Sequence, residues 1–347
     1  MTNNKIDVSI VIPCRNEKNF INECIESIIE NDFPQDNFEV LIVDGMSEDG
    51  TRDIIRQHAN KYPFIILLDN PKRITPVAMN IGIKQARGNY IVILSSHSKI
   101  DKNFLKLNLE YIVKHNVDCV GGILITLPHN STILAKSIAK ALSHPFGVGN
   151  AYFRTGSKES RNVDTVPFGC YKKDIFQKVG LFDEDLIRNQ DDEFNHRLIR
   201  KKGKILLIPD IISYYYARNS LTKLWRMYYQ YGYFKPLVSI KIGAILTLRQ
   251  IIPSLFLISL FLSAIAMLFS AFFLSIFTVI VFSYLFLNIG ISLVIALREG
   301  LRYLFYLPFV FATMHLSYGA GYLKGILNFI VLKQHIRKKI SDVPMTR

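Results

Sequence analysis

The chain contains a run of 47 residues, 251–297, without a single Asp, Glu, Lys or Arg. A second charge-free run covers residues 303–323. A helix that crosses a bilayer needs roughly 20 apolar residues, so the first run is long enough for two such helices. The apolar residues of a soluble protein are interspersed with charged ones, and these runs therefore predict a C-terminal α-helical membrane region.

The charges that flank the first run indicate its orientation. We expect two membrane spans, at about 251–272 and 275–297, which together form a hairpin. Arg249 and Arg298 lie at the outer ends of this hairpin. Because basic residues are enriched on the cytosolic side of membrane helices, both ends of the hairpin are expected there.

The remaining C-terminal segments are less regular. The expected membrane region, 251–332, ends with a third segment at about 303–332, which contains a proline and several glycines. This segment could cross the bilayer, re-enter it or lie at its surface. Residues 226–250 mix aromatic, basic and aliphatic side chains and are predicted to form an interfacial amphipathic connection, with an ordinary linker helix as the alternative. Residues 333–347 are expected to form a basic cytosolic tail.

Charge and cysteine content narrow the classes of function. The chain has 42 Lys and Arg against 28 Asp and Glu, a net charge of +14. Much of this excess flanks the apolar runs, so the expected partner is the lipid bilayer and not nucleic acid. The four cysteines form no C-x-x-C pair that would indicate a zinc site. The N-terminal apolar stretch is too short for a signal peptide, so we expect an integral membrane protein of the cell membrane with a cytosolic catalytic domain.

Residues 1–225 alternate short apolar runs with helical patterns. Nearly continuous apolar runs are typical of strands that are buried on both faces of a parallel sheet. Strands that alternate with helices predict a doubly wound α/β domain with a mostly parallel sheet. The expected strands are Val8–Ile12, Glu39–Val43, Phe64–Leu68 and Tyr90–Leu94, and the expected helices are Asn19–Glu30, Thr51–Lys61 and Pro76–Arg87.

Ligands of such domains bind at the carboxyl ends of the strands, so the residues that follow the strands are candidates for chemistry. Neither a G-x-G-x-x-G dinucleotide motif nor a P-loop motif follows any expected strand. Asp44 follows the second strand, where its carboxylate can accept hydrogen bonds from a base or a ribose. Taken alone, residues 44–51 also fit an ordinary turn that ends in a helix N-cap.

Longer motifs favour one interpretation. VSIVIPCRNE at 8–17, followed by LIVDGMSEDGT at 41–51, resembles the start of family 2 glycosyltransferases, which have the GT-A nucleotide-sugar-binding fold. Segments 70–73, 166–171 and 189–198 are similar to later motifs of that family, in the same order. The resemblance is greatest to the membrane-bound branch that includes succinoglycan-biosynthesis glycosyltransferases. It implies transfer of a sugar from a nucleotide-sugar donor, with inversion at the anomeric carbon.

The resemblance assigns the catalytic base to Asp191. Transfer to a hydroxyl requires a base that accepts the hydroxyl proton as the oxygen attacks the anomeric carbon. Acids at a helix start can also simply complement the helix dipole, with Asn189 as N-cap, and Asp192 fits that role. Residues expected to support the catalytic helix or the acceptor are Gly169, Gln190, Asp192, Glu193, Arg197, Trp225 and Arg226.

The metal position departs from the family pattern. Family members usually have Asp-x-Asp after the fourth strand, and this branch commonly has Asp-Ala-His, but this chain has Ser95-Ser96-His97. The resemblance makes His97 a metal ligand and leaves Ser95 in place of the acid. Neutral imidazole suits Mn²⁺ better than Mg²⁺, so a divalent metal, Mn or Mg, is expected. Lys72 and Arg73 offer an alternative way to neutralise the diphosphate of the donor.

The resemblance places the donor against the strand ends, at Pro13, Arg15, Glu17, Asp44, Asp49, Lys72, Arg73 and Ser95. We therefore expect an inverting glycosyltransferase whose acceptor is a lipid-linked saccharide. A polyprenyl-phosphate sugar synthase and a non-catalytic nucleotide-binding scaffold at the membrane are the alternatives. The sequence does not indicate an oligomeric state.

Overall fold

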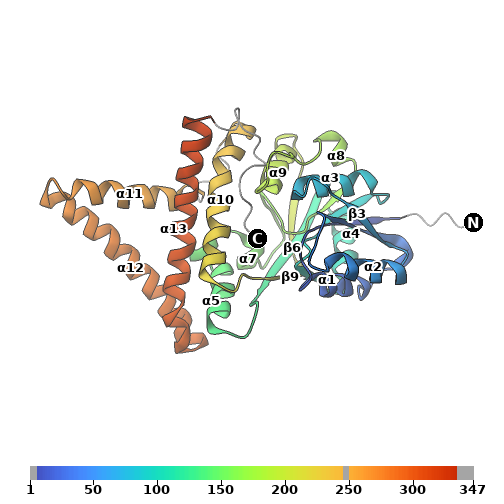
Figure 1. Ribbon diagram of the computed structural model, residues 1–347, viewed down its shortest axis with the longest axis horizontal. Helices are drawn as coiled ribbons and strands as arrows, with labels where there is room; N and C mark the ends of the chain where they lie inside the picture. Colours follow the sequence, from blue (N-terminus) through green and yellow to red (C-terminus); the bar gives the residue numbers. More distant parts are fainter. Residues whose placement is uncertain (1–5, 245–249, 334–347) are drawn as a thin grey trace, which may run out of the picture. The chain divides into compact units, whose positions relative to one another are not determined.

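A computed structural model describes residues 6–244 and 250–333 (Figure 1). They form two compact units. The first is built from the chain up to residue 125 and from residues 152–216, and the second from 126–151 and from residue 217 onward. The sequence boundary at 225 falls inside a helix, α10 (Leu221–Ile242), whose whole length belongs to the second unit.

Nine strands of the described residues join in one α/β sheet, in the order β3-β2-β1-β4-β8-β6-β9-β5, with β7 beside β9. The pairs β3–β2, β2–β1 and β1–β4 are parallel. These are the four predicted strands, shifted by one or two residues at their ends. Their bounds are β1 Val8–Cys14, β2 Phe38–Asp44, β3 Ile65–Asp69 and β4 Tyr90–Ile93.

The remaining strands extend the sheet with antiparallel pairs: β4–β8, β6–β8, β5–β9 and β7–β9. This half was not predicted from the sequence, because three of its strands have only two or three residues. The bounds are β5 Ser98–Ile100, β6 Cys119–Leu127, β7 Arg161–Asn162, β8 Cys170–Lys172 and β9 Ile205–Tyr216.

Helices cover both faces of the sheet (Figure 1). Successive side chains of a strand point to opposite faces, so Ile10 and Ile12 join one core while Val11 joins the other. On the Ile10 face lie α1 Ile21–Ile29, α2 Thr51–Lys61 and α4 Phe104–Lys114. On the Val11 face lie α3 Thr75–Gln85, α8 Ile175–Lys178 and α9 Gln190–Arg200.

The second unit is helical, and α10 packs closely against α13 (Leu307–Gly325). A Cβ atom at Gly232 would lie 2.1 Å from the Tyr318 carbonyl oxygen, and one at Gly321 would lie 2.0 Å from the Tyr229 carbonyl oxygen. Only glycine permits this backbone approach. The other elements are α5 Ile133–Leu142, α6 Pro145–Val148, α11 Ile252–Ala266, α12 Ala271–Glu299, a 3₁₀ turn at Leu301–Phe305 and a π-helix at Ile326–Val331.

Within the described ranges, α12 is the one helix that is long and apolar enough to cross a membrane, judged by length and composition. α11 is apolar but has 15 residues, fewer than the roughly 20 that a span requires. The two helices meet between Ala266 and Ala271, so the first predicted span, 251–272, extends past the end of α11. Residues 245–249 of the predicted connection, and the predicted tail beyond Lys333, lie outside the described residues.

Candidate active site

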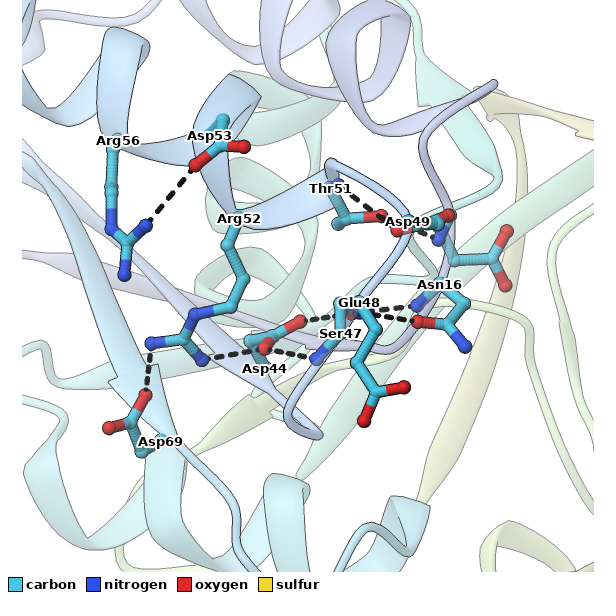
Figure 2. Close-up of polar contacts among 11 residues, drawn as sticks. Asn16, Asp44, Ser47, Glu48, Asp49, Thr51, Arg52, Asp53, Arg56 and Asp69 are labelled. Atoms are coloured by element: carbon cyan, nitrogen blue, oxygen red, sulfur yellow. Dashed lines mark hydrogen bonds and ion pairs between the residues drawn. The ribbon is translucent and has the colours of Figure 1, made fainter.

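The loops that follow β1 and β2 are joined by hydrogen bonds between backbone amides and side chains (Figure 2). The Asn16 N–H donates to Ser47 Oγ at 2.7 Å, and the Glu48 N–H donates back to Asn16 Oδ1 at 3.1 Å. The Glu17 N–H donates to Thr51 Oγ1 at 2.9 Å. Asn16 has a positive φ of 53°, which asparagine tolerates better than most residues. The two loops therefore form one fixed edge at the carboxyl ends of the strands.

Asp44, a predicted donor contact, is fully buried at the end of β2. Its Oδ2 accepts a hydrogen bond from the Ser47 N–H at 2.9 Å. The same oxygen forms an ion pair with Arg52 at 2.7 Å. The other terminal nitrogen of Arg52 contacts Asp69 at 2.7 Å, at the end of β3 (Figure 2). Hydrogen bonds to Asp69 and Asp44 raise the pKa of Arg52. Arg52 thus links Asp44 and Asp69, at the ends of two neighbouring strands.

Asp49, the second predicted acid of this region, lies just before the start of α2. It accepts a hydrogen bond from the Thr51 N–H at 3.0 Å (Figure 2). It accepts a second from the Lys18 N–H at 3.2 Å. Partial burial raises its pKa, but the hydrogen bonds from Thr51 and Lys18 outweigh that effect and lower it. In this structure Asp49 connects the β1 loop to the β2 loop.

Two more predicted donor contacts, Pro13 and Arg15, lie on the β1 side of this edge. Pro13 is half-buried and pairs in register with Val43 of β2. Arg15 passes close over Gly45, where an added Cβ atom would lie 3.0 Å from Arg15 Cδ. A side chain at position 45 would displace Arg15, so Gly45 permits the observed position of the arginine.

His97 and Ser95 lie beside the same edge, after β4. His97 Nδ1 is 3.4 Å from Glu17 Oε1, and both side chains are partly exposed. The Ser95 hydroxyl lies 3.3 Å from each ring nitrogen of His97. The ring of Tyr215, on β9, meets the imidazole edge to face with centroids 5.3 Å apart. The structure therefore brings together three residues predicted for the donor and the metal.

Lys72, predicted as an alternative cation for the diphosphate, forms an ion pair with Glu184 at 3.0 Å. The hydrogen bond from Lys72, with a second from Asn80, lowers the pKa of Glu184. Asn80 is buried and also exchanges two hydrogen bonds with the backbone of Phe182. Arg73, the other predicted cation, follows with a positive φ of 60°. The positive charge of Lys72 is therefore paired with the carboxylate of Glu184.

The predicted catalytic helix is α9, which begins at Gln190. Asp191 is exposed in its first turn and Asp192 is half-buried. Glu193 is buried and forms a two-pronged ion pair with Arg197, at 2.5 and 2.8 Å. Asn189 occupies the N-cap position of α9, as expected. That residue has left-handed backbone angles, and its side chain makes no capping hydrogen bond.

Arg197 anchors α9 to the preceding segment. Its guanidinium donates to the carbonyl oxygens of Val179 at 2.7 Å and Leu181 at 2.8 Å. The predicted support residues Glu193 and Arg197 thus act together, since the ion pair neutralises the buried acid while the guanidinium holds the neighbouring backbone. Trp225 and Arg226, the other predicted support residues, lie on α10 in the second unit, where Trp225 is exposed.

Comparison with known proteins identifies the family. Residues 9–178 match the model of glycosyl transferase family 2. The chain is 36% identical over 240 residues to a dolichyl N-acetyl-α-D-glucosaminyl phosphate 3-β-D-2,3-diacetamido-2,3-dideoxy-β-D-glucuronosyltransferase of Methanococcus voltae, covering 67% of this chain and 73% of that protein. This chain belongs to glycosyltransferase family 2.

Other family members and a solved structure agree. The glycosyltransferase is 30% identical over 246 residues to the succinoglycan biosynthesis protein ExoA of Rhizobium meliloti, covering 70% of this chain and 73% of that protein. The mannosyltransferase PcManGT of Pyrobaculum calidifontis, solved with GDP-Man and Mn²⁺, superposes with a TM-score of 0.61 at 19% identity. It covers 92% of this chain and 87% of that one. At that identity the match shows the fold, a GT-A-type α/β sheet.

GT-A glycosyltransferases often use a divalent metal, and the residues around His97 offer ligands for one. Within the described ranges, no three His, Cys, Asp or Glu side chains come together to hold an ion unaided. His97 and Glu17 supply one imidazole nitrogen and one carboxylate oxygen, both suitable for Mn²⁺. Two protein ligands fit a metal whose other ligands come from the diphosphate of the donor and from water.

The glycosyltransferase also has residues beside the candidate site that were not predicted from the sequence. The Tyr171 hydroxyl donates to Asn195 Oδ1 at 3.0 Å, and the Asn195 amide donates to Thr165. Burial, with added repulsion from Cys119 and Asp191, raises the pKa of the Tyr171 hydroxyl well above its usual range. Asn195 lies one helical turn after Asp191, and that spacing of four is the signal that would have indicated a shared face. The predicted Gly169 leaves room for the Tyr171 ring, because a Cβ atom there would lie 2.8 Å from the ring.

Proposed function

We propose that this glycosyltransferase transfers a sugar from a nucleotide-sugar to a lipid-linked saccharide at the cytosolic face of the membrane, with inversion. The acceptor hydroxyl oxygen attacks the anomeric carbon, the bond from that carbon to the diphosphate oxygen breaks, and the nucleoside diphosphate leaves. Asp191 accepts the hydroxyl proton. A divalent metal, held by His97, would neutralise negative charge on the leaving diphosphate.

The observation that carries this proposal is the exposure of Asp191 on a helix whose other acids are less accessible. Glu193 is buried against Arg197, and Asp192 is half-buried, whereas Asp191 is exposed in the first turn of α9. A base must reach its substrate, so exposure distinguishes Asp191 from Glu193. The partial positive charge of the helix N-terminus also favours the ionised carboxylate that a base needs.

The name of one relative supports a lipid-linked acceptor. The M. voltae enzyme acts, by its name, on a dolichyl N-acetylglucosaminyl phosphate, a sugar attached to a polyprenyl lipid. The second unit supports attachment to a membrane. Phe282 and Phe286 of α12 are exposed over 66% and 79% of their surface, as expected of a helix that contacts lipid. We therefore propose that α12, with α11, anchors the protein in the bilayer.

The decisive experiment compares Asp191→Asn with Asp192→Asn in the detergent-purified full chain. Each variant is offered lipid-linked saccharides or polyprenyl phosphate, with a panel of nucleotide-sugars. We expect Asp191→Asn to lower transfer to the saccharide hydroxyl by about 10²- to 10⁴-fold, and Asp192→Asn to change it little. A phosphate acceptor is already ionised and needs no base. Transfer to polyprenyl phosphate that survives Asp191→Asn would therefore identify a polyprenyl-phosphate sugar synthase instead.

A further inference from the structure

With His97 alone as its protein ligand, the metal site would lack a negatively charged ligand. His97 supplies a neutral ligand, and Ser95, two residues earlier, supplies a neutral hydroxyl. A divalent cation beside a diphosphate is held more firmly by an anionic oxygen than by a hydroxyl. Among the described residues, Glu17 brings such an oxygen next to the imidazole, from the β1 loop instead of the β4 loop.

The distance between the two side chains suits ligands of a shared ion. The 3.4 Å between Glu17 Oε1 and His97 Nδ1 exceeds the about 2.7–3.2 Å of an ordinary N–H···O hydrogen bond. Two ligands that are each about 2.1 Å from one ion, at a right angle or slightly wider, lie about 3.0–3.4 Å apart. The observed separation therefore matches adjacent positions around a single cation.

The backbone of Glu17 and the ring of His97 are held in place before any ion binds. The Glu17 N–H donates to Thr51 Oγ1, and the Glu17 carbonyl accepts the N–H groups of Phe20 and Ile21, each at 2.9 Å. The His97 ring is packed by Phe20 on one side and Tyr215 on another. The two side chains remain 23% and 22% exposed, so a ligand can reach them. A preformed pair loses less conformational entropy on binding an ion.

We propose that Glu17 is the second protein ligand of the divalent metal and takes the place of the acid that is absent at Ser95. The two ligands come from different strands, and the remaining coordination positions are left for diphosphate oxygens and water. This inference rests on the proposed function, because it assumes a nucleoside diphosphate at the same edge of the sheet.

The test measures Mn²⁺ binding without turnover, from the electron paramagnetic resonance signal of free Mn²⁺ in the presence of a nucleoside diphosphate. Loss of a supporting residue in a metal site typically costs about 10- to 100-fold in affinity. We expect Glu17→Gln to weaken Mn²⁺ binding at least about tenfold. Adding Ser95→Asp to that variant should restore affinity, because it returns a carboxylate to the site. Glu26→Gln, at an exposed acid of α1, is the matched control.

A second titration follows nucleoside diphosphate binding in EDTA, to separate ligation of metal from contact with the nucleotide. The inference is supported if Glu17→Gln weakens Mn²⁺ binding but leaves metal-free nucleotide affinity unchanged. It is overturned if Mn²⁺ affinity is unchanged, or if nucleotide affinity in EDTA falls by the same factor. Failure of the wild type to bind any nucleoside diphosphate would instead overturn the proposed function.

Discussion

The loops after β1 and β2 and the first turn of α9 both carry acids that match family motifs, yet the two regions use their acids differently. In the loops, Asp44 is buried under Arg52, and Asp49 binds backbone amides. In α9, the buried acid is Glu193, and Asp191 stays exposed. A sequence motif therefore indicates where a group of acids lies, and the contacts with neighbouring side chains determine which acid is available for chemistry.

The two regions also differ in how their buried acid is satisfied. Asp44 accepts hydrogen bonds from the backbone and the hydroxyl of Ser47 besides its ion pair with Arg52. Glu193, by contrast, pairs through both carboxylate oxygens with the guanidinium of Arg197. We therefore expect loss of the arginine to cost more stability at α9 than in the loops.

The largest effect is expected for Arg197→Met. It leaves Glu193 buried without its cation and removes the bonds to the carbonyls of Val179 and Leu181. Removing one partner of a buried ion pair typically costs about 3–5 kcal/mol of unfolding free energy. Thermal or denaturant unfolding of the detergent-solubilised chain measures this loss. The double variant Glu193→Gln/Arg197→Met should recover part of it, and a loss below about 1 kcal/mol in the single variant would contradict the role of this ion pair.

Much of the first unit was predictable because its signals are local. The four parallel strands are continuous apolar runs, and the structure contains each of them. The antiparallel half was missed because β5, β7 and β8 are too short to show a period of two. The membership of segment 126–151 in the second unit depends on packing against helices distant in sequence, which no local pattern encodes.

The candidate site was likewise predictable in part, where its residues belong to local motifs. Family motifs indicated Asp44, Asp191 and His97, but they did not indicate that Glu17 and His97, which belong to segments far apart in the sequence, lie together. The proximity of Glu17 and His97 results from the adjacency of β1 and β4, which a sequence motif does not specify. Asn189 likewise occupies the predicted N-cap position, but its residue type did not predict the left-handed backbone or the lack of a side-chain capping hydrogen bond.

An intermediate effect is expected for Arg52→Met, which tests the loop side of the comparison. Loss of a hydrogen bond to a charged group costs about 1.5–3 kcal/mol, and Asp44 keeps its two bonds from Ser47. We expect a loss in that range, smaller than for Arg197→Met, measured by the same unfolding experiment. Arg56→Met is the control, because its ion pair with Asp53 is exposed on both sides and should contribute less than about 1 kcal/mol. Equal losses at positions 52 and 197 would remove the distinction between the regions.

The smallest effect is expected for Asp49→Asn, and it should depend on pH. Hydrogen bonds from Thr51 and Lys18 lower the pKa of Asp49 in the folded state, so the ionised carboxylate stabilises the fold. That contribution is present above the unfolded-state pKa of about 3.9 and is lost as pH falls through the lower folded-state value. Because Asp49 is exposed, we expect Asp49→Asn to cost less than about 1 kcal/mol at pH 7.

Denaturant midpoints of the wild type and Asp49→Asn, measured from pH 7 down to about pH 3, should therefore converge at the acidic end. Asp53→Asn, at an exposed acid of α2, controls for a general change in surface charge. A difference between the wild type and Asp49→Asn that stays constant over this range would show that the amide geometry, and not the charge, is what matters at position 49. The β1 and β2 loops would then be held by hydrogen bonds that are insensitive to ionisation, and their contrast with the ion pair of α9 would become sharper.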